Sequence, residues 1–176
     1  MFKRFFPSEY VPSIADINYK ALQSRGIIGL IFDIDNTIEG YGATTASKEK
    51  AEFLKGLKEK GFKICLVSNN GEERVRLFAE GLSKAGLSLP SIHKAGKPKK
   101  SVVPRAAALM GVSPLETAFI GDQVFTDIWC GNRCKTYTIL VKPVTKIDPC
   151  LVRLKRLPED FVKARYVRYI KKQQNG

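Results

Sequence analysis

The chain has 176 residues, of which 44% are hydrophobic, and a formal net charge of +13. This composition is typical of one globular domain with its own core and excludes an intrinsically disordered chain. The longest uncharged apolar run, residues 26–32, is too short to cross a bilayer, and the N-terminus lacks the apolar segment of a signal peptide. We therefore expect a protein that is cytoplasmic, or peripheral on the inner face of a membrane.

The basic excess lies mainly at the C-terminal end. Residues 142–176 contain ten Lys or Arg and three acidic residues, which gives this segment a charge of +7. Such a charge favours an anionic partner, namely a nucleic acid, an acidic membrane or a phosphorylated substrate. We divide the single domain into an N-terminal extension (1–25), a catalytic core (26–144) and a basic tail (145–176). The sequence gives no indication of the oligomeric state.

Apolar strand-like runs alternate with amphipathic helical runs along the core. Strands are predicted at 27–35, 62–70, 91–95, 117–122 and 136–144, and helices at 47–61, 71–86, 101–111 and 124–132. The tail, 149–173, is expected to be helical in part and broken near Pro158. Continuous apolar strands that are each followed by a helix are typical of a parallel sheet covered on both faces. The predicted fold is therefore α/β, with a Rossmann-like three-layer α/β/α core and a mainly parallel sheet.

The four cysteines do not indicate a metal centre. Cys65 lies within an apolar strand-like run, Cys130 and Cys134 are four residues apart, and the only histidine is His93. A structural zinc site needs more ligands than these residues offer in such spacing. We expect reduced thiols in a reducing compartment.

Polar residues follow each of the first four predicted strands. They are Asp33, Asp35 and Thr37 after the first strand, Ser68 and Asn69 after the second, Lys97 after the third, and Asp122 and Asp127 after the fourth. Ligands of parallel α/β sheets bind beyond the carboxyl ends of the strands, so these side chains are expected to meet at one edge of the sheet. Carboxylates, a hydroxyl and an ammonium group together suit a divalent cation and a phosphoryl group.

This arrangement predicts a reaction as well as a site. We expect Mg²⁺ to be bound by the carboxylates of Asp33 and Asp122 and by the main-chain carbonyl of Asp35. Asp33 is the expected nucleophile toward phosphorus, and Asp35 the expected proton donor to the leaving oxygen and base for water.

The remaining residues of this edge are expected to support the reaction. Ser68 and Lys97 are expected to bind the phosphoryl oxygens, and Asn69 to present its main-chain N–H to the phosphate. Thr37 is expected to brace the loop, and Asp127 either to bind the metal or to support its ligands. Glu39 lies just past the loop and has no predicted role.

The motifs resemble those of the haloacid dehalogenase (HAD) superfamily. DIDNT at 33–37, VSNN at 67–70, Lys97-Pro98 and GDQVFTD at 121–127 are similar to its four motifs, in the same order, and span residues 27–130. The resemblance implies a magnesium-dependent phosphatase that uses Asp33 as its nucleophile. The segments between the motifs, 31 residues from Thr37 to Ser68 and 29 from Ser68 to Lys97, leave no room for a large cap domain.

The N-terminal segment, the FDIDNT core and GDQVFTDIWCGN further resemble the YqeG-type branch of the superfamily, subclass IIIA. That branch resembles the mitochondrial phosphatidylglycerophosphate phosphatase. The resemblance implies hydrolysis of phosphatidylglycerophosphate to phosphatidylglycerol, a step of phospholipid biosynthesis, and hence contact with a lipid head group.

Two other functions stay open on the sequence alone. The same chemistry could act on a soluble nucleotide, a sugar phosphate or a nucleic-acid end, or the chain could be a basic RNA- or ribosome-binding protein with a vestigial site. The aromatic and basic residues at the two ends, including Phe2, Phe5 and Phe6, suit an anionic membrane, RNA or simple packing against the edge of the sheet. Nucleic acid is the less favoured of the two anionic partners.

Overall fold

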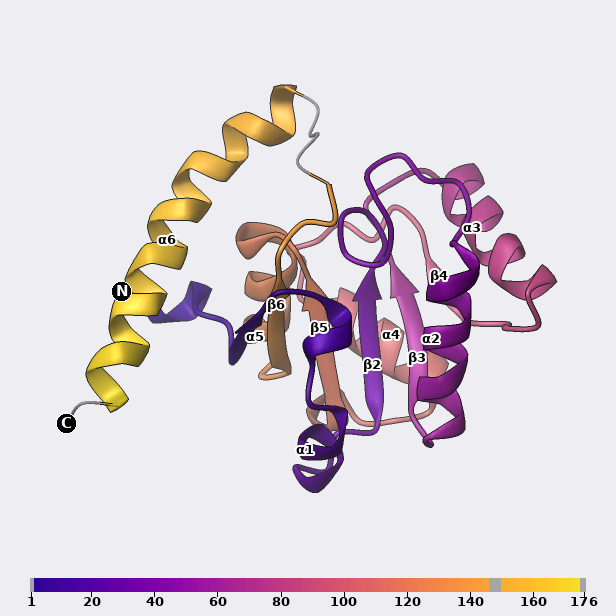
Figure 1. The fold of residues 1–176 in the computed structure, drawn as a ribbon, viewed down its shortest axis with the longest axis horizontal. Helices are drawn as coiled ribbons and strands as arrows, with labels where there is room; N and C mark the ends of the chain where they lie inside the picture. Colours follow the sequence, from indigo (N-terminus) through magenta and orange to yellow (C-terminus); the bar gives the residue numbers. More distant parts are fainter. Residues whose placement is uncertain (1, 146–149, 175–176) are drawn as a thin grey trace.

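A parallel β-sheet forms the centre of the molecule (Figure 1). The computed structural model describes residues 2–145 and 150–174, without the side chains of 150–157 and 174. The sheet contains β1 (Glu9–Val11), β2 (Gly29–Asp33), β3 (Lys63–Val67), β4 (Ser91–Ile92), β5 (Thr117–Gly121) and β6 (Tyr137–Val141). Its strand order is β1-β6-β5-β2-β3-β4, and every neighbouring pair is parallel.

Helices cover both faces of the sheet, which confirms the predicted three-layer fold. The α-helices are α1 (Tyr19–Ser24), α2 (Lys48–Glu59), α3 (Glu72–Lys84), α4 (Val102–Met110), α5 (Trp129–Arg133) and α6 (Cys150–Gln174). Shorter turns are η1 (Phe2–Phe5), η2 (Ile14–Asp16), η3 (Pro114–Glu116) and the π-helical turn η4 (Val124–Ile128). The connection from β2 to β3 contains a loop and α2, and that from β3 to β4 contains α3, so these described segments form no cap domain.

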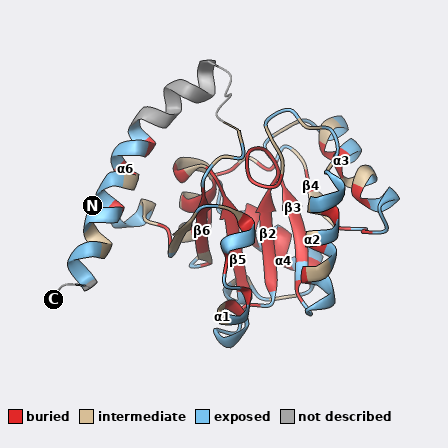
Figure 2. Cartoon of the chain, viewed as in Figure 1, coloured by how far each residue is buried: buried red, intermediate tan, exposed pale blue. Residues whose placement is uncertain are grey.

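Successive residues of β2 face opposite sides of the sheet, as the two-residue period of a strand requires. Leu30 and Phe32 belong to the core beneath α1, α2 and α3, whereas Ile31 packs with residues of α4 and α5. All five residues of β2 are buried, as are most of the neighbouring strands in Figure 2. Asp33 ends this strand, and its carboxylate lies beside residues that follow β4 and β5.

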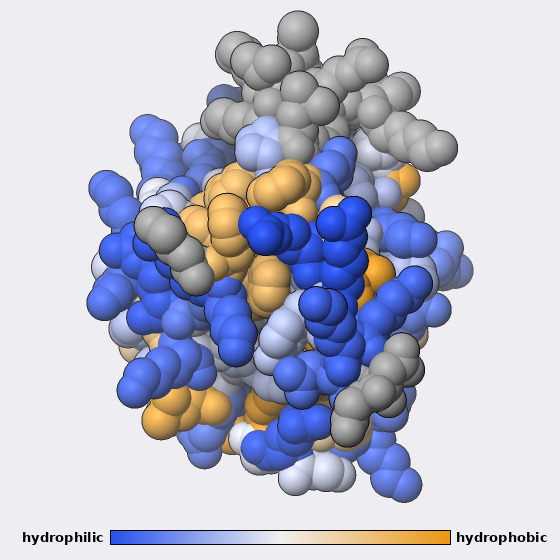
Figure 3. All heavy atoms as spheres, turned by 90° about the vertical axis from the view of Figure 1, so that its left-hand side faces the viewer, coloured by the Kyte–Doolittle hydropathy of each residue, from blue (hydrophilic) through white to orange (hydrophobic). Residues whose placement is uncertain are grey.

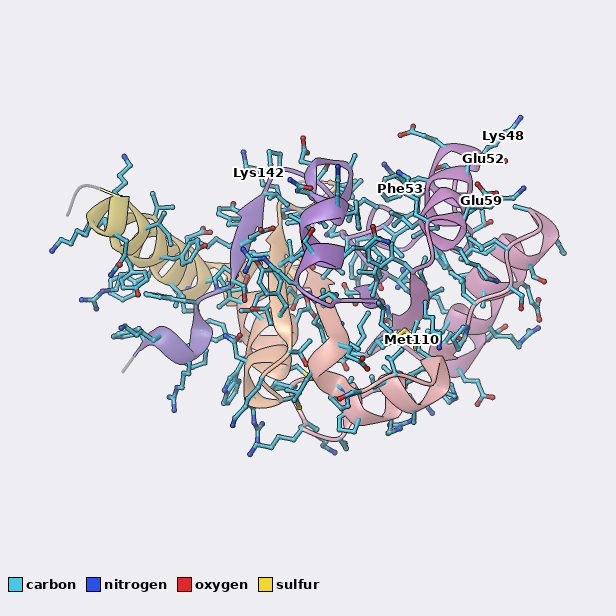
Figure 4. The ribbon with its side chains drawn as sticks, turned by 90° about the horizontal axis from the view of Figure 1, so that it is seen from below. Lys48, Glu52, Phe53, Glu59, Met110 and Lys142 are labelled. Carbon is cyan, nitrogen blue, oxygen red and sulfur yellow. The ribbon has the colours of Figure 1, made fainter. Side chains whose placement is uncertain are left out.

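Helix α2 shows how the amphipathic helices attach to the sheet. Lys48, Glu52 and Glu59 lie on its outer side in Figure 4, while Phe53 points back toward α1. The ring centroid of Phe53 lies 6.0 Å from that of Tyr19. Ser47 begins the helix by accepting a hydrogen bond from the N–H of Lys50, as an N-cap serine does.

The N-terminal segment contains a strand that the sequence did not predict. β1 pairs with β6 in parallel register, with Glu9 opposite Ile139, and becomes the edge of the sheet. Its three residues are partly buried and have no long apolar run, because an edge strand needs only one covered face.

The predicted break near Pro158 is wrong, since α6 continues from Cys150 to Gln174 through this residue. Proline removes one main-chain hydrogen bond and bends a helix but need not end it. The residues after Pro158 are held by the core: Val162 and Tyr166 are buried, and Val162 packs with Val124, Ile128 and Leu140. In the described part of the chain, no helix has the length and apolar character to span a bilayer.

Candidate active site

Three buried carboxylates meet beyond the carboxyl ends of β2 and β5. Asp33 ends β2, Asp122 directly follows β5, and Asp127 lies in η4. One carboxylate oxygen of each residue lies within 4.8 Å of the corresponding oxygens of the other two. Because β2 and β5 are adjacent parallel strands, their last residues lie at the same edge of the sheet. The structure thus brings Asp33, Asp122 and Asp127, which were all expected at this edge of the sheet, into one cluster.

Lys97 joins two of these carboxylates. Its Nζ lies 2.5 Å from Oδ1 of Asp33 and 2.7 Å from Oδ1 of Asp127, and the lysine side chain is buried. Asn69 fixes the main chain of this lysine, since its Oδ1 accepts from the N–H of Lys97 at 2.8 Å and its Nδ2 donates to the carbonyl at 3.2 Å. The side chain of Asn69 is therefore engaged with Lys97, and contact of its main-chain N–H with a phosphate stays a prediction.

The charges of the cluster change the pKa values of its members. Burial raises the pKa of Asp33 well above its usual range, against the opposing effect of Lys97, and Asp127 and Asp122 raise it further. Burial lowers the pKa of Lys97, but Asp127 and Asp33 more than compensate, so its pKa is raised overall. Three carboxylates around one ammonium group leave excess negative charge in a buried place, and hard oxygen donors of this kind fit a divalent cation such as Mg²⁺.

Gly121 and η4 explain the position of Asp127. A Cβ atom at Gly121 would overlap the Asp127 carboxyl group, so a larger residue at this position would displace it. The N–H of Gln123 donates to Oδ2 of Asp127 at 3.0 Å, which leaves Oδ1 toward Lys97. Gly121, which ends β5, therefore makes room for the carboxylate of Asp127, and the next residue, Asp122, supplies another carboxylate of the cluster.

The side chain of Asp35 lies outside the acidic cluster. It forms an ion pair with Arg74 of α3 and accepts hydrogen bonds from Nδ2 of Asn70 at 2.5 Å and from the N–H of Gly42 at 3.2 Å. The carboxylate of Asp35 is therefore not a member of the candidate metal-binding group, and the role of its main-chain carbonyl as a metal ligand stays a prediction. The two carboxylates of FDID therefore point to different partners, and each of them contacts a cation.

Arg74 is a site residue that the sequence interpretation missed. It lies in the first turn of α3, where the helix dipole favours acidic and disfavours basic side chains. An arginine at this position, just after the second motif, was a signal that a nearby carboxylate binds it. Arg74 also lies over the ring of Tyr41, 5.5 Å from its centroid.

Ser68 lies near Asp35, and Thr37 lies beside Asp33. Ser68 is buried, its Oγ accepts from the N–H of Asn70 at 3.1 Å, and it lines a small pocket together with Asp35 and Arg74. Oγ1 of Thr37 lies 3.4 Å from Oδ2 of Asp33, at the long end of hydrogen bonding. Thr37 thus contacts the predicted nucleophile from within the loop that follows β2.

Glu39 and Asn36 have structural roles that the sequence did not reveal. The Glu39 carboxylate accepts from the N–H of Ser47 at 2.7 Å, so it supports the start of α2 and is not directed at a substrate. Asn36 has a φ of 57° and accepts from the N–H and Oγ1 of Thr145 at 3.2 and 2.8 Å. It ties the loop after β2 to the segment that follows β6.

Comparison with known proteins agrees with this geometry. The family model described as "Hydrolase: haloacid dehalogenase-like hydrolase" matches residues 15–134. The chain belongs to this family. The match, together with 39% identity to the "Probable phosphatase YqeG" of Bacillus subtilis over 90% of both chains, confirms the predicted class of enzyme, a phosphoric monoester hydrolase.

One further sequence relative and one solved structure are more distant matches. The chain is 29% identical to "Phosphatidylglycerophosphate phosphatase 1, chloroplastic" of Chlamydomonas reinhardtii over 93% of its own length, and it spans 62% of that algal protein. Among solved structures, NagD from E. coli K-12 matches with a TM-score of 0.50 and 18% identity, over 68% of this chain and 90% of that one, which shows a shared fold.

Proposed function

We propose that the protein is a Mg²⁺-dependent phosphomonoester hydrolase that works through an aspartyl-phosphate on Asp33 and dephosphorylates phosphatidylglycerophosphate to phosphatidylglycerol. The observation that carries this proposal is the acidic cluster of Asp33, Asp122 and Asp127 with Lys97 between two of its members. A buried carboxylate beside a cation, in a cluster of hard oxygen donors, is suited to nucleophilic attack on phosphorus.

The first step transfers the phosphoryl group to Asp33. A carboxylate oxygen of Asp33 attacks phosphorus, the bond between phosphorus and the ester oxygen breaks, and Asp35 gives its proton to that leaving oxygen. In the second step a water molecule gives a proton to Asp35 and attacks phosphorus, which releases inorganic phosphate and the free carboxylate of Asp33. Arg74 and Asn70, which contact Asp35, orient its carboxyl group for both proton transfers.

The other polar residues hold the phosphoryl group and its charge. Lys97 remains protonated and balances negative charge on the transferred oxygens, while Oγ of Ser68 donates to one of them. Mg²⁺, bound by Asp33, Asp122 and the main-chain carbonyl of Asp35, would polarise the phosphoryl oxygens when present. Asp127 holds Lys97 through its 2.7 Å contact and lies close enough to share the cation.

The lipid substrate is supported by likeness and by the lack of a cap domain between the described strands. The algal relative bears the name of a phosphatidylglycerophosphate phosphatase and the Bacillus relative that of a probable phosphatase. No cap domain is inserted between the described strands, and the lack of an inserted domain is what a large head group would require.

The test is phosphate release from phosphatidylglycerophosphate in vesicles, with and without Mg²⁺, beside a panel of soluble phosphomonoesters. We expect strong preference for the lipid, dependence on Mg²⁺, and loss of release in Asp33→Asn. Glu52→Gln, which changes an exposed carboxylate on the outer side of α2, is the matched control and should keep full activity.

Other outcomes separate the parts of the proposal. Hydrolysis of soluble esters alone would keep the mechanism and reject the lipid. Equal rates in wild type and Asp33→Asn would reject the nucleophile, and no release from any ester would favour a binding protein with a vestigial site.

A further inference from the structure

A basic stripe runs along the exposed side of α6. Phe161, Arg165, Arg168 and Lys172 follow the i, i+4, i+7, i+11 spacing of one helix face, and all four are exposed. Beside them lie Phe2 and Lys3 of η1. We call these six residues the tail face. Figure 3 looks onto this side of the molecule and shows hydrophobic side chains surrounded by hydrophilic ones.

The tail face is held in place by the packing beneath it. Phe6 packs against Tyr166 and Tyr169 with ring centroids 5.6 Å apart in each pair, and Phe5 packs against Phe125 at 5.2 Å. The buried Glu159 accepts from the N–H of Phe125 at 3.3 Å and so joins α6 to η4. The cations of the tail face are thus carried by a helix that the core fixes, and their arrangement is a property of the fold.

The cations of the tail face have no acidic partners within the described residues. Asp160 pairs with Lys163 on another side of the helix at 3.6 Å, and no described carboxylate forms an ion pair with Arg165, Arg168 or Lys172. Arg165 instead lies over the rings of Phe2 and Phe161, 4.8 and 5.4 Å from their centroids. Positive charge without counter-charge on a fixed surface is complementary to an anionic one.

Apolar side chains are exposed within the same surface. Phe2 is 39% and Phe161 55% exposed, and their rings meet edge to face at 5.9 Å. Arg165, Arg168 and Lys172, together with Phe6 and Tyr169, line a groove of 390 Å³. Exposed phenyl rings among cations are the combination that lies in the head-group layer of an acidic membrane.

We propose that the tail face docks the protein on the surface of an anionic phospholipid bilayer, with Phe2 and Phe161 entering the head-group layer and phosphate groups bound along Arg165, Arg168 and Lys172. This inference rests on the proposed function, because docking would place the enzyme on the surface that contains its proposed lipid substrate. RNA is the less suitable partner, because the Arg165 guanidinium already lies over both phenyl rings and would compete with bases that stack on them.

The test is sedimentation of the full chain with vesicles of phosphatidylcholine alone and of phosphatidylcholine mixed with phosphatidylglycerol, without any reaction. We expect binding only to the mixed vesicles, weakened by added salt. The triple change Arg165→Gln, Arg168→Gln, Lys172→Gln should reduce the partition coefficient roughly 100-fold, since each basic residue near an anionic surface contributes measurably to binding. The change Lys48→Gln, Lys55→Gln, Lys60→Gln removes the same charge from exposed positions of α2 and its end and should have a much smaller effect.

A second pair of variants tests the apolar contribution. Phe161→Ser should weaken binding to mixed vesicles several-fold, whereas Leu109→Ser, at a residue of α4 that is also 55% exposed, should not. Unfolding temperatures of all variants, compared with wild type, show whether a loss of binding reflects a loss of folding.

Three results would overturn the proposal: equal binding to both vesicle types, an equal loss in the two triple variants, or RNA binding that depends on Arg165, Arg168 and Lys172 in a protein that ignores vesicles. The proposed function is judged separately, from phosphatidylglycerophosphate dissolved in detergent. Hydrolysis there without vesicle binding would reject the docking surface alone, and vesicle binding without hydrolysis would reject the catalytic proposal alone.

Discussion

The acidic cluster and the tail face use charge in opposite ways. The cluster buries three carboxylates around one lysine at the end of the sheet, with contacts of 2.5 and 2.7 Å, whereas the tail face exposes arginines and a lysine beside phenyl rings. A buried charge is strongly affected by each neighbour, because water does not screen it. An exposed charge contributes little free energy alone, because water and salt screen it, so several exposed charges must act together to bind a partner. Single substitutions should therefore matter at the cluster, and only combined substitutions on the tail face.

The largest expected effect comes from Asp33→Asn. It should lower phosphate release by roughly 10⁴-fold or more, because the nucleophile is lost. Without Mg²⁺ the unfolding temperature should not fall, since burial raises the pKa of Asp33 and the neutral amide avoids the desolvation of a carboxylate. A phosphate assay measures the loss of release, and calorimetry measures the unfolding temperature. A variant that is much less stable yet active would contradict a functional role for this buried charge.

Mg²⁺ should stabilise the protein against heat. At about 100 times its dissociation constant, a ligand of the native state adds about 2.7 kcal/mol, or about 5–10 °C for a chain of this size. The gain should decrease as the pH is lowered, because burial raises the pKa of Asp33 and protons then compete with the metal for its carboxylate. Asp122→Asn should reduce the shift and Glu52→Gln should leave it unchanged. A shift independent of pH and of Asp122 would place the metal elsewhere.

Arg74→Gln tests whether Asp35 must be oriented. We expect kcat to fall about 10- to 100-fold with KM little changed, because the ion pair with Asp35 serves the proton transfers and not substrate binding. Arg76→Gln, at an exposed residue of the same helix that pairs with Glu80, is the control. A rise in KM with unchanged kcat would instead make Arg74 a substrate-binding residue.

Glu159→Ala should have a smaller effect, on stability. It removes the acceptor of the Phe125 N–H in a buried place, which costs about 1–3 kcal/mol. Asp160→Ala changes the neighbouring carboxylate, whose side chain is 69% exposed, and should cost at most about 0.5 kcal/mol. Denaturant unfolding measures the free energy of unfolding of both variants relative to wild type. Equal losses would show that α6 is not held on the core through Glu159.

The buried part of the fold followed from the sequence because its signals are local. β2, β3 and β5 are apolar runs that end in polar residues, and the four motifs lie where the parallel topology brings them together. The two-residue spacing of Asp33 and Asp35 was visible too, but the different partners of the two carboxylates were not. Those partners, Lys97 and Arg74, come from segments far along the chain.

The edges of the fold depended on long-range contacts that no local pattern carries. β1 is short and only partly buried, so its pairing with β6 left no apolar run in the sequence. α6 continues through Pro158 because the residues after it pack on the core, a contact that outweighs the helix-breaking tendency of one proline. Glu39 had no predicted role, because its contact with Ser47 depends on how the loop turns.

The most direct test of the account is detection of the phosphorylated enzyme during turnover. A reaction with phosphatidylglycerophosphate and Mg²⁺ is quenched rapidly and treated with borohydride, which converts an aspartyl-phosphate to homoserine, and the peptides are then analysed by mass spectrometry. The account predicts homoserine at position 33, absent without substrate and absent in Asp33→Asn. Active enzyme with no modification at position 33, or with modification at another carboxylate, would contradict it.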